Sequence, residues 1–166
     1  MLPELQNFLQ RIEDLRAMVG ELIANLSAEA LNWRPFEGDQ GRVTNSLAAL
    51  LAHIAGAEHF WIGEVVGGSP PTRDRDGEFA AEATGPAPLL RLLDETGAET
   101  RKVLSRLTST DLGGVREARG RTIPVRWCIL HVVEHTALHL GHMQLTYQLW
   151  AEGRSRPSPL WFERLP

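Results

Sequence analysis

Apolar residues recur along the first segment of the chain in steps of three and four, the spacing of one face of an α-helix. Charged residues fill most of the remaining positions, and Pro3 suits a first helical turn. The pattern predicts an amphipathic helix over residues 3–25, followed by a short turn that Ser27 caps. The apolar positions are Leu5, Phe8, Leu9, Ile12, Leu15, Val19, Leu22, Ile23 and Leu26.

Three further segments have helical patterns. Residues 45–67 are apolar on almost every side, which predicts a buried helix that begins at a Thr44 or Asn45 cap. Residues 86–107 and 123–151 carry the other two helices, and no segment has a convincing strand pattern. Four long helices predict an all-α four-helix bundle.

The connection at 68–85 is long and polar, and it is rich in Pro, Gly, Asp and Arg. Extended, it could span up to about 60 Å, whereas the helix before it is only about 35 Å long. It could therefore run back along the molecule and leave the second and third helices parallel. The bundle should occupy residues 1–152, and the tail 153–166, with Trp161 and Phe162, should pack on it or on a partner chain.

Composition excludes several classes of protein. The net charge is -4, and Lys102 is the sole lysine, so the basic patch of a nucleic-acid-binding protein is missing. No window approaches 18 uninterrupted apolar residues, which argues against a membrane span, and the charged N-terminal segment does not resemble a signal peptide. The single cysteine, Cys128, excludes an intrachain disulfide and suits a reducing compartment. We expect a cytoplasmic protein.

The most informative feature is a stripe of imidazoles on the last predicted helix. His131, His135, His139 and His142 fall at about 0°, 40°, 80° and 20° around a helix axis, so they share one face. Imidazole is the commonest protein ligand for zinc, nickel, copper and iron. His53, in the apolar second helix, is the best candidate for a further ligand. The sequence therefore predicts a metal site between two helices.

Spacing alone does not select the ligands on the last helix. Residues four apart are about 5–6 Å from each other, so His131 with His135 and His135 with His139 both qualify. Thr136 follows His135 where zinc proteases have glutamate, and the Glu-x-x-His pairs of di-iron bundles are missing. Three protein ligands would leave a position open for water or substrate, as in catalytic sites. Nitrogen ligation does not choose between zinc, nickel and iron.

Four motifs occur together in this chain. They are Trp33-Arg34-Pro35, His53, Gly56-Ala57-Glu58-His59-Phe60-Trp61 and Glu134-His135-Thr136-Ala137-Leu138-His139-Leu140-Gly141-His142. With these motifs the chain resembles the DinB/YfiT-like superfamily over residues 5–151. The family often has a Glu-x-x-Trp stretch after its first histidine, and often a glutamine where this chain has His142.

The resemblance implies a four-helix bundle with a long link between helices two and three, assembled as a homodimer. It implies that His53, His135 and His139 bind a divalent metal ion, with zinc or nickel favoured and iron as the alternative. Related proteins include transferases and isomerases that use small cellular thiols, and many are described as hydrolases. The family name comes from damage-inducible expression, which suggests a role in stress response.

The other titratable groups have weaker assignments. His142 and Glu134 are the candidates for moving a proton, and Glu134 is also a candidate for orienting a ligand histidine through its second ring nitrogen. We expect His131 and His59 to be structural or to line a pocket. Cys128 is expected to be a buried, inert thiol.

These expectations combine into one functional hypothesis. A metal ion on three histidines would activate water, or a low-molecular-weight thiol cosubstrate, for attack on a small-molecule substrate. The enzyme would be a hydrolase or a thiol S-transferase, and Arg126 or Arg42 could bind the carboxylates of the thiol. The alternatives are a metal-binding stress protein without turnover and a dimeric bundle with a vestigial site. Acid should release the ion at about pH 5–6.

Overall fold

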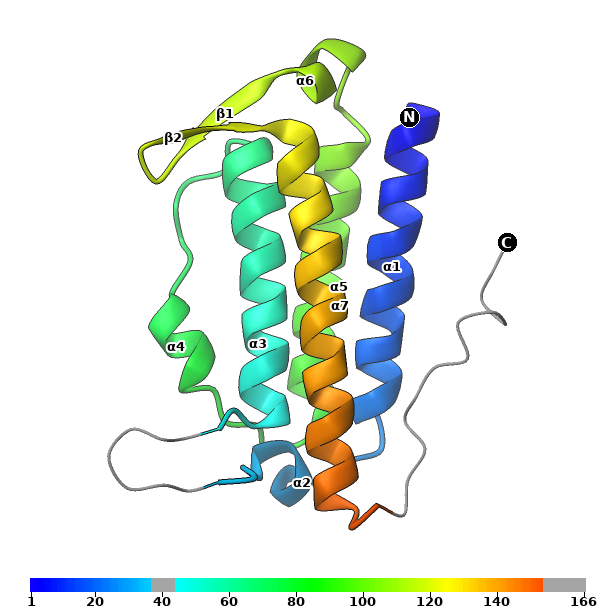
Figure 1. Cartoon of the computed structure of the whole chain (residues 1–166), viewed down its shortest axis with the longest axis vertical. Coiled ribbons are helices and arrows are strands. Elements are labelled where there is room, and N and C mark those ends of the chain that lie inside the picture. The colour runs from blue at the N-terminus through cyan, green and yellow to red at the C-terminus, as the bar shows by residue number, and fades with distance from the viewer. Residues whose placement is uncertain (37–43, 154–166) are drawn as a thin grey trace.

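A computed structural model describes residues 1–36 and 44–153, and it confirms the all-α four-helix bundle (Figure 1). None of the described helices has an apolar stretch long enough to cross a bilayer. The predictions for Arg42, Trp161 and Phe162 lie outside the described residues. The four long segments that run side by side are α1 (Pro3–Ile23), α3 (Leu47–Glu58) with its continuation η2 (His59–Val66), α5 (Pro86–Leu104) and α7 (Val125–Trp150).

The chain order produces a crossover bundle. Figure 1 shows that α3 and α5 run in the same direction, whereas α1 and α7 run in the opposite one. The link between α3 and α5 returns along the outside of the bundle, which is the parallel arrangement that its length allowed. Within it lies the short helix α4 (Arg75–Phe79).

Serine side chains cap the first turns of two helices that follow loops. Ser27 accepts a hydrogen bond from the backbone of α2 (Ala28–Asn32), as predicted. The cap of α3 is Ser46, so the prediction of Thr44 or Asn45 is wrong by one or two residues. All three residue types can accept a bond from the first turn, and the sequence alone does not rank them.

The second predicted helix changes its pitch halfway. After Glu58 the chain continues as the π-helical segment η2, where the backbone N–H of Gly67 donates to the carbonyl oxygen of Ile62, five residues earlier. This wider turn shifts the faces of the later residues relative to a regular α-helix. Such segments are rare and often occur at functional sites.

The prediction of no strands is wrong. Between α6 (Ser109–Gly113) and α7, the chain forms an antiparallel hairpin from β1 (Val115–Ala118) and β2 (Arg121–Pro124). The two turn residues, Arg119 and Gly120, both have positive φ, which is the geometry that joins two strands most tightly. Each strand has four residues and is largely exposed, so it leaves little alternation of apolar and polar positions to detect.

One ion pair is buried among the helices. Arg16 of α1 donates to Glu58 of α3, and the hydroxyl of Thr100 on α5 donates to the same carboxylate oxygen. The residues Arg16 and Glu58 are only 8% and 2% exposed. Gly97 makes room for this pair, because a Cβ there would lie 2.6 Å from a guanidinium nitrogen of Arg16. A glycine within a helix lowers its stability, and packing around the ion pair explains why Gly97 occurs in α5.

Candidate metal centre

Helices α3 and α7 bring three histidines together at the middle of the bundle. One ring nitrogen from each of His53, His135 and His139 lies within 4.8 Å of the others. The Nε2 atoms of His53 and His135 are 3.0 Å apart, and the three ring centroids are separated by 4.4 to 5.0 Å. These are the three residues that the sequence singled out, and the cluster that they form could bind a metal ion.

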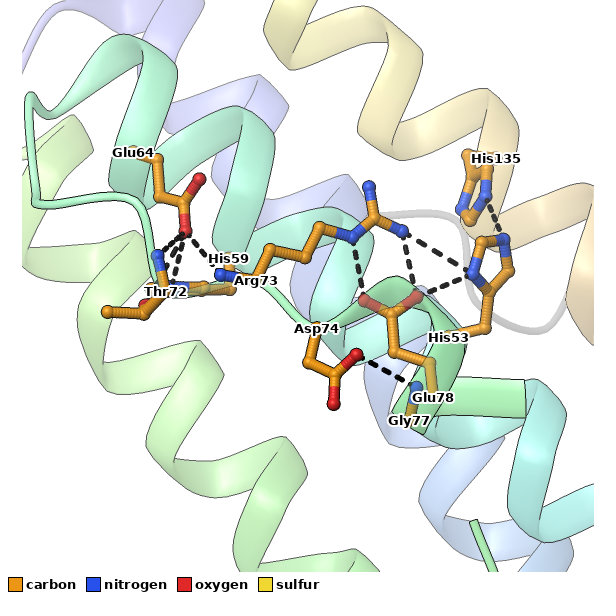
Figure 2. Close-up of polar contacts among 9 residues, drawn as sticks. All are labelled: His53, His59, Glu64, Thr72, Arg73, Asp74, Gly77, Glu78 and His135. Atoms are coloured by element: carbon orange, nitrogen blue, oxygen red, sulfur yellow. Dashed lines mark hydrogen bonds and ion pairs between the residues drawn. The ribbon is translucent and has the colours of Figure 1, made fainter. Parts of the chain in front are cut away.

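A carboxylate from the link orients the first of these rings (Figure 2). Glu78 Oε2 lies 2.8 Å from His53 Nδ1. An ionised carboxylate only accepts hydrogen bonds, so Nδ1 carries the proton and Nε2 presents its lone pair to the cluster. Arg73 donates to both oxygens of Glu78, at 2.6 and 2.8 Å. This carboxylate–histidine arrangement is the usual support for a metal-bound imidazole.

Glu78 was not among the site residues predicted from the sequence, because it lies 25 residues after His53 in the polar connection between two helices. Asp74 caps the short helix that carries it by accepting from the backbone of Gly77. Gly56 leaves the space that the carboxyl group occupies, since a Cβ there would lie 2.0 Å from Glu78 Oε1. A glycine three residues after His53, within an otherwise apolar helix, was the available signal.

The cluster is electrically neutral at neutral pH. Burial lowers the pKa of His135 to about 3 and that of His139 to about 4, and the neighbouring imidazoles add to the effect. Burial also lowers the pKa of His53, although Glu78 opposes the shift. Burial alone would raise the pKa of Glu78, but hydrogen bonds from Arg73 and His53 hold it below its usual value. All three rings therefore keep the lone pair that a metal requires.

His131 lies outside this cluster. Its ring stacks on Trp127, with centroids 4.7 Å apart and planes 6° apart, and it meets the ring of Trp61 edge-on. Burial lowers its pKa as well. The geometry thus favours His139 over His131 as the partner of His135, and it places His131 in an aromatic group beside the site.

The two candidate proton carriers differ in position. His142 is exposed, and its Nδ1 lies 3.3 Å from Nδ1 of His139. Glu134 is also exposed, but it makes no hydrogen bond or ion pair within the described part of the chain. The orienting role suggested for Glu134 is filled by Glu78.

A second histidine network anchors the start of the link (Figure 2). Glu64 Oε1 accepts from the backbone N–H groups of Thr72 and Arg73, at 2.6 and 2.8 Å. His59 lies beside it, with its ring nitrogens 2.6 Å from Glu99 and 2.8 Å from Thr72. This network holds the backbone from which the Arg73 side chain extends toward Glu78.

Two further candidates lie away from the cluster. Arg126, in the first turn of α7, pairs with Glu4 and donates to the carbonyl of Leu112. Its guanidinium is thus engaged by α1 and α6. Cys128 is buried, and burial raises the pKa of its thiol to about 11, in agreement with the expected inert role.

Comparison with solved structures shows the same fold. A DinB-like protein from Bacillus cereus superposes with a TM-score of 0.72 at 17% identity, covering 88% of this chain and 92% of its own. A DinB-like protein from Bacillus subtilis gives 0.69 at 20% identity, covering 96% and 99%.

A mycothiol-dependent maleylpyruvate isomerase also shares the fold. It gives a TM-score of 0.61 at 18% identity and covers 86% of this chain but 61% of its own. No curated protein matches the sequence significantly. The model of the DinB superfamily matches residues 11–143, which is most of the chain. With these matches added to its helix order and its fold, the chain belongs to the DinB superfamily.

Proposed function

We propose that this protein is a metal-dependent enzyme that acts on a small molecule, with a divalent ion held by His53, His135 and His139. The observation that carries the proposal is the convergence of three neutral imidazoles, one of them oriented by Glu78. Three protein ligands leave a coordination position open, as in catalytic sites. When bound, such an ion makes water or a thiol nucleophilic near neutral pH. We take zinc or nickel as the favoured ion, with iron as the alternative.

The residues around the histidines have separate tasks in this proposal. Glu78 keeps the proton on Nδ1 of His53, and Arg73 keeps Glu78 ionised through two hydrogen bonds. His142, exposed and next to His139, is placed to exchange a proton with solvent. The candidate Glu134 has no comparable contact in the described structure, so we give this task to His142.

The first test is the metal content of a ligand variant. His135→Ala should lose stoichiometric metal binding, because two imidazoles cannot hold the ion firmly. His131→Ala removes an imidazole one turn away on the same helix and should keep full metal content. Both variants would be loaded with zinc or nickel, dialysed and measured by elemental analysis. Full retention of metal by His135→Ala would refute the site.

A second test distinguishes a thiol-dependent enzyme from a hydrolase. The neighbour described as a mycothiol-dependent isomerase favours a thiol cosubstrate, so small thiols should give a thiolate-to-metal charge-transfer band with the cobalt-substituted protein. If the protein gives no such band but hydrolyses members of a panel of esters and amides, it is a hydrolase. If neither response appears while metal binding is intact, the protein is a non-catalytic metal-binding protein.

The role of Glu78 can be tested through the space that it occupies. Gly56→Ala should displace the carboxyl group from His53, because the added Cβ would lie 2.0 Å from Glu78 Oε1. Loss of such a support lowers metal affinity by about 10- to 100-fold. Gly141→Ala is the matched control, since no atom of the other described segments lies within 4 Å of a Cβ at that position. Chelator competition would measure both affinities, and equal values would contradict the role of Glu78.

Metal release by acid should occur below the pH 5–6 that unperturbed histidines would give. Protons compete with a metal only below the pKa of its ligands, and those of His135 and His139 are about 3 and 4 instead of 6.5. The apparent affinity should stay level down to about pH 5 and fall steeply near pH 4.

The measurement is metal content after dialysis across this range. The unfolded chain binds more protons than the metal-free fold between pH 6.5 and about 3, so the stability of the metal-free protein also falls on acidification. Circular dichroism at each pH would show whether release precedes unfolding. A release midpoint near pH 6 with intact helices would contradict the lowered pKa values.

A further inference from the structure

A groove of about 380 Å³ lies along the C-terminal part of α7 and reaches His139 of the histidine cluster. His139 and His142 line one end, and Leu145 and Leu149 continue its wall along the same helix. The opposite wall includes Leu50 of α3 and Phe36, which precedes α3. A molecule held at the three histidines therefore has an adjoining space for the rest of its body.

The described lining of this groove is largely apolar. Among the lining residues that the structure describes, none is Asp, Glu, Lys or Arg. A charged group placed there would lose its hydration without gaining a partner, which is costly. The polar atoms at its edges come from neutral side chains, among them Thr44, Asn45 and Thr146.

A larger cavity of about 510 Å³, between α3, the link and α5, has the opposite character. Carboxylates of Asp74, Glu95 and Glu99 stand around it, and none of the three clustered histidines lines it. It meets the site at Glu78 and Arg73, the two residues that support His53. The apolar groove, in contrast, reaches His139 directly.

We propose that the groove binds the apolar part of the substrate, so that the substrate class is an uncharged molecule with a hydrocarbon group beside the reacting bond. This inference rests on the proposed function, because it takes the histidine cluster as the reactive end. Burial of each methylene in such a groove strengthens binding by about fourfold. Molecules with a carboxylate in place of the hydrocarbon end should bind less well, because none of the described lining residues is Arg or Lys.

The test uses straight-chain alkanethiols, from ethanethiol to hexanethiol, with the cobalt-substituted protein. Their dissociation constants are read from the thiolate-to-cobalt absorption band. Binding should tighten by about two- to fourfold per methylene until the groove is filled, and mercaptocarboxylates of equal length should bind more weakly. Constants that do not change with chain length, or tighter binding of the carboxylates, would overturn the proposal.

Two exposed leucines on α7 provide a matched pair of variants. Leu145 lines the groove and is 55% exposed, whereas Leu138 lies outside the groove and is 59% exposed. Leu145→Asn should reduce the increase in alkanethiol affinity per added methylene. Leu138→Asn should leave that increase unchanged. If instead both variants change the oligomeric state and neither changes that increase, this face of α7 binds a second copy of the chain and the proposal is wrong.

A metal-independent measurement separates this proposal from the proposed function. The uncharged fluorescent dye N-phenyl-1-naphthylamine should bind the metal-free protein, and Leu145→Asn should weaken it at least threefold relative to Leu138→Asn. If the two variants differ in dye binding but the protein takes up no cobalt, the proposal for the groove stands and the metal site is refuted. Cobalt uptake with no difference between the two variants would refute the groove and retain the metal site.

Discussion

The carboxylate of Glu78 is the interaction on which the candidate site depends. It accepts two hydrogen bonds from Arg73 and one from His53, so a charge that would be costly to bury is fully paired. The same contacts settle which nitrogen of His53 carries its proton. Glu78 and Arg73 both lie on the link between α3 and α5, so the crossover connection contributes two residues to the candidate site.

The link in turn is held by the helices that it passes. Glu64 of η2 binds the backbone at Thr72 and Arg73, and His59 of η2 contacts Glu99 of α5. The Arg16–Glu58 pair deeper in the bundle connects α1 to α3. These polar contacts thus orient α3, and with it the His53 ring that faces α7.

The sequence predicted the long helices well, because amphipathic and apolar periods report directly on which faces are buried. It also predicted the histidine face of α7, since angular position along one helix follows from spacing alone. It failed for the hairpin, whose two strands are short and exposed, and for η2, whose wider turn leaves no compositional mark. The cap at Ser46 was missed among three adjacent residues that can all accept the same bond.

Spacing within single segments was therefore enough to predict the bundle and the histidine face of α7, and the family resemblance added the choice of His53, His135 and His139. Contacts between segments distant in sequence were shown only by the tertiary structure: the position of His139 rather than His131 beside His53, the carboxylate of Glu78, and the apolar groove at His139. The physical reason is that periodicity describes how one helix faces its surroundings, whereas a site needs atoms from several segments at defined distances. Those distances depend on how the helices pack and where the link returns.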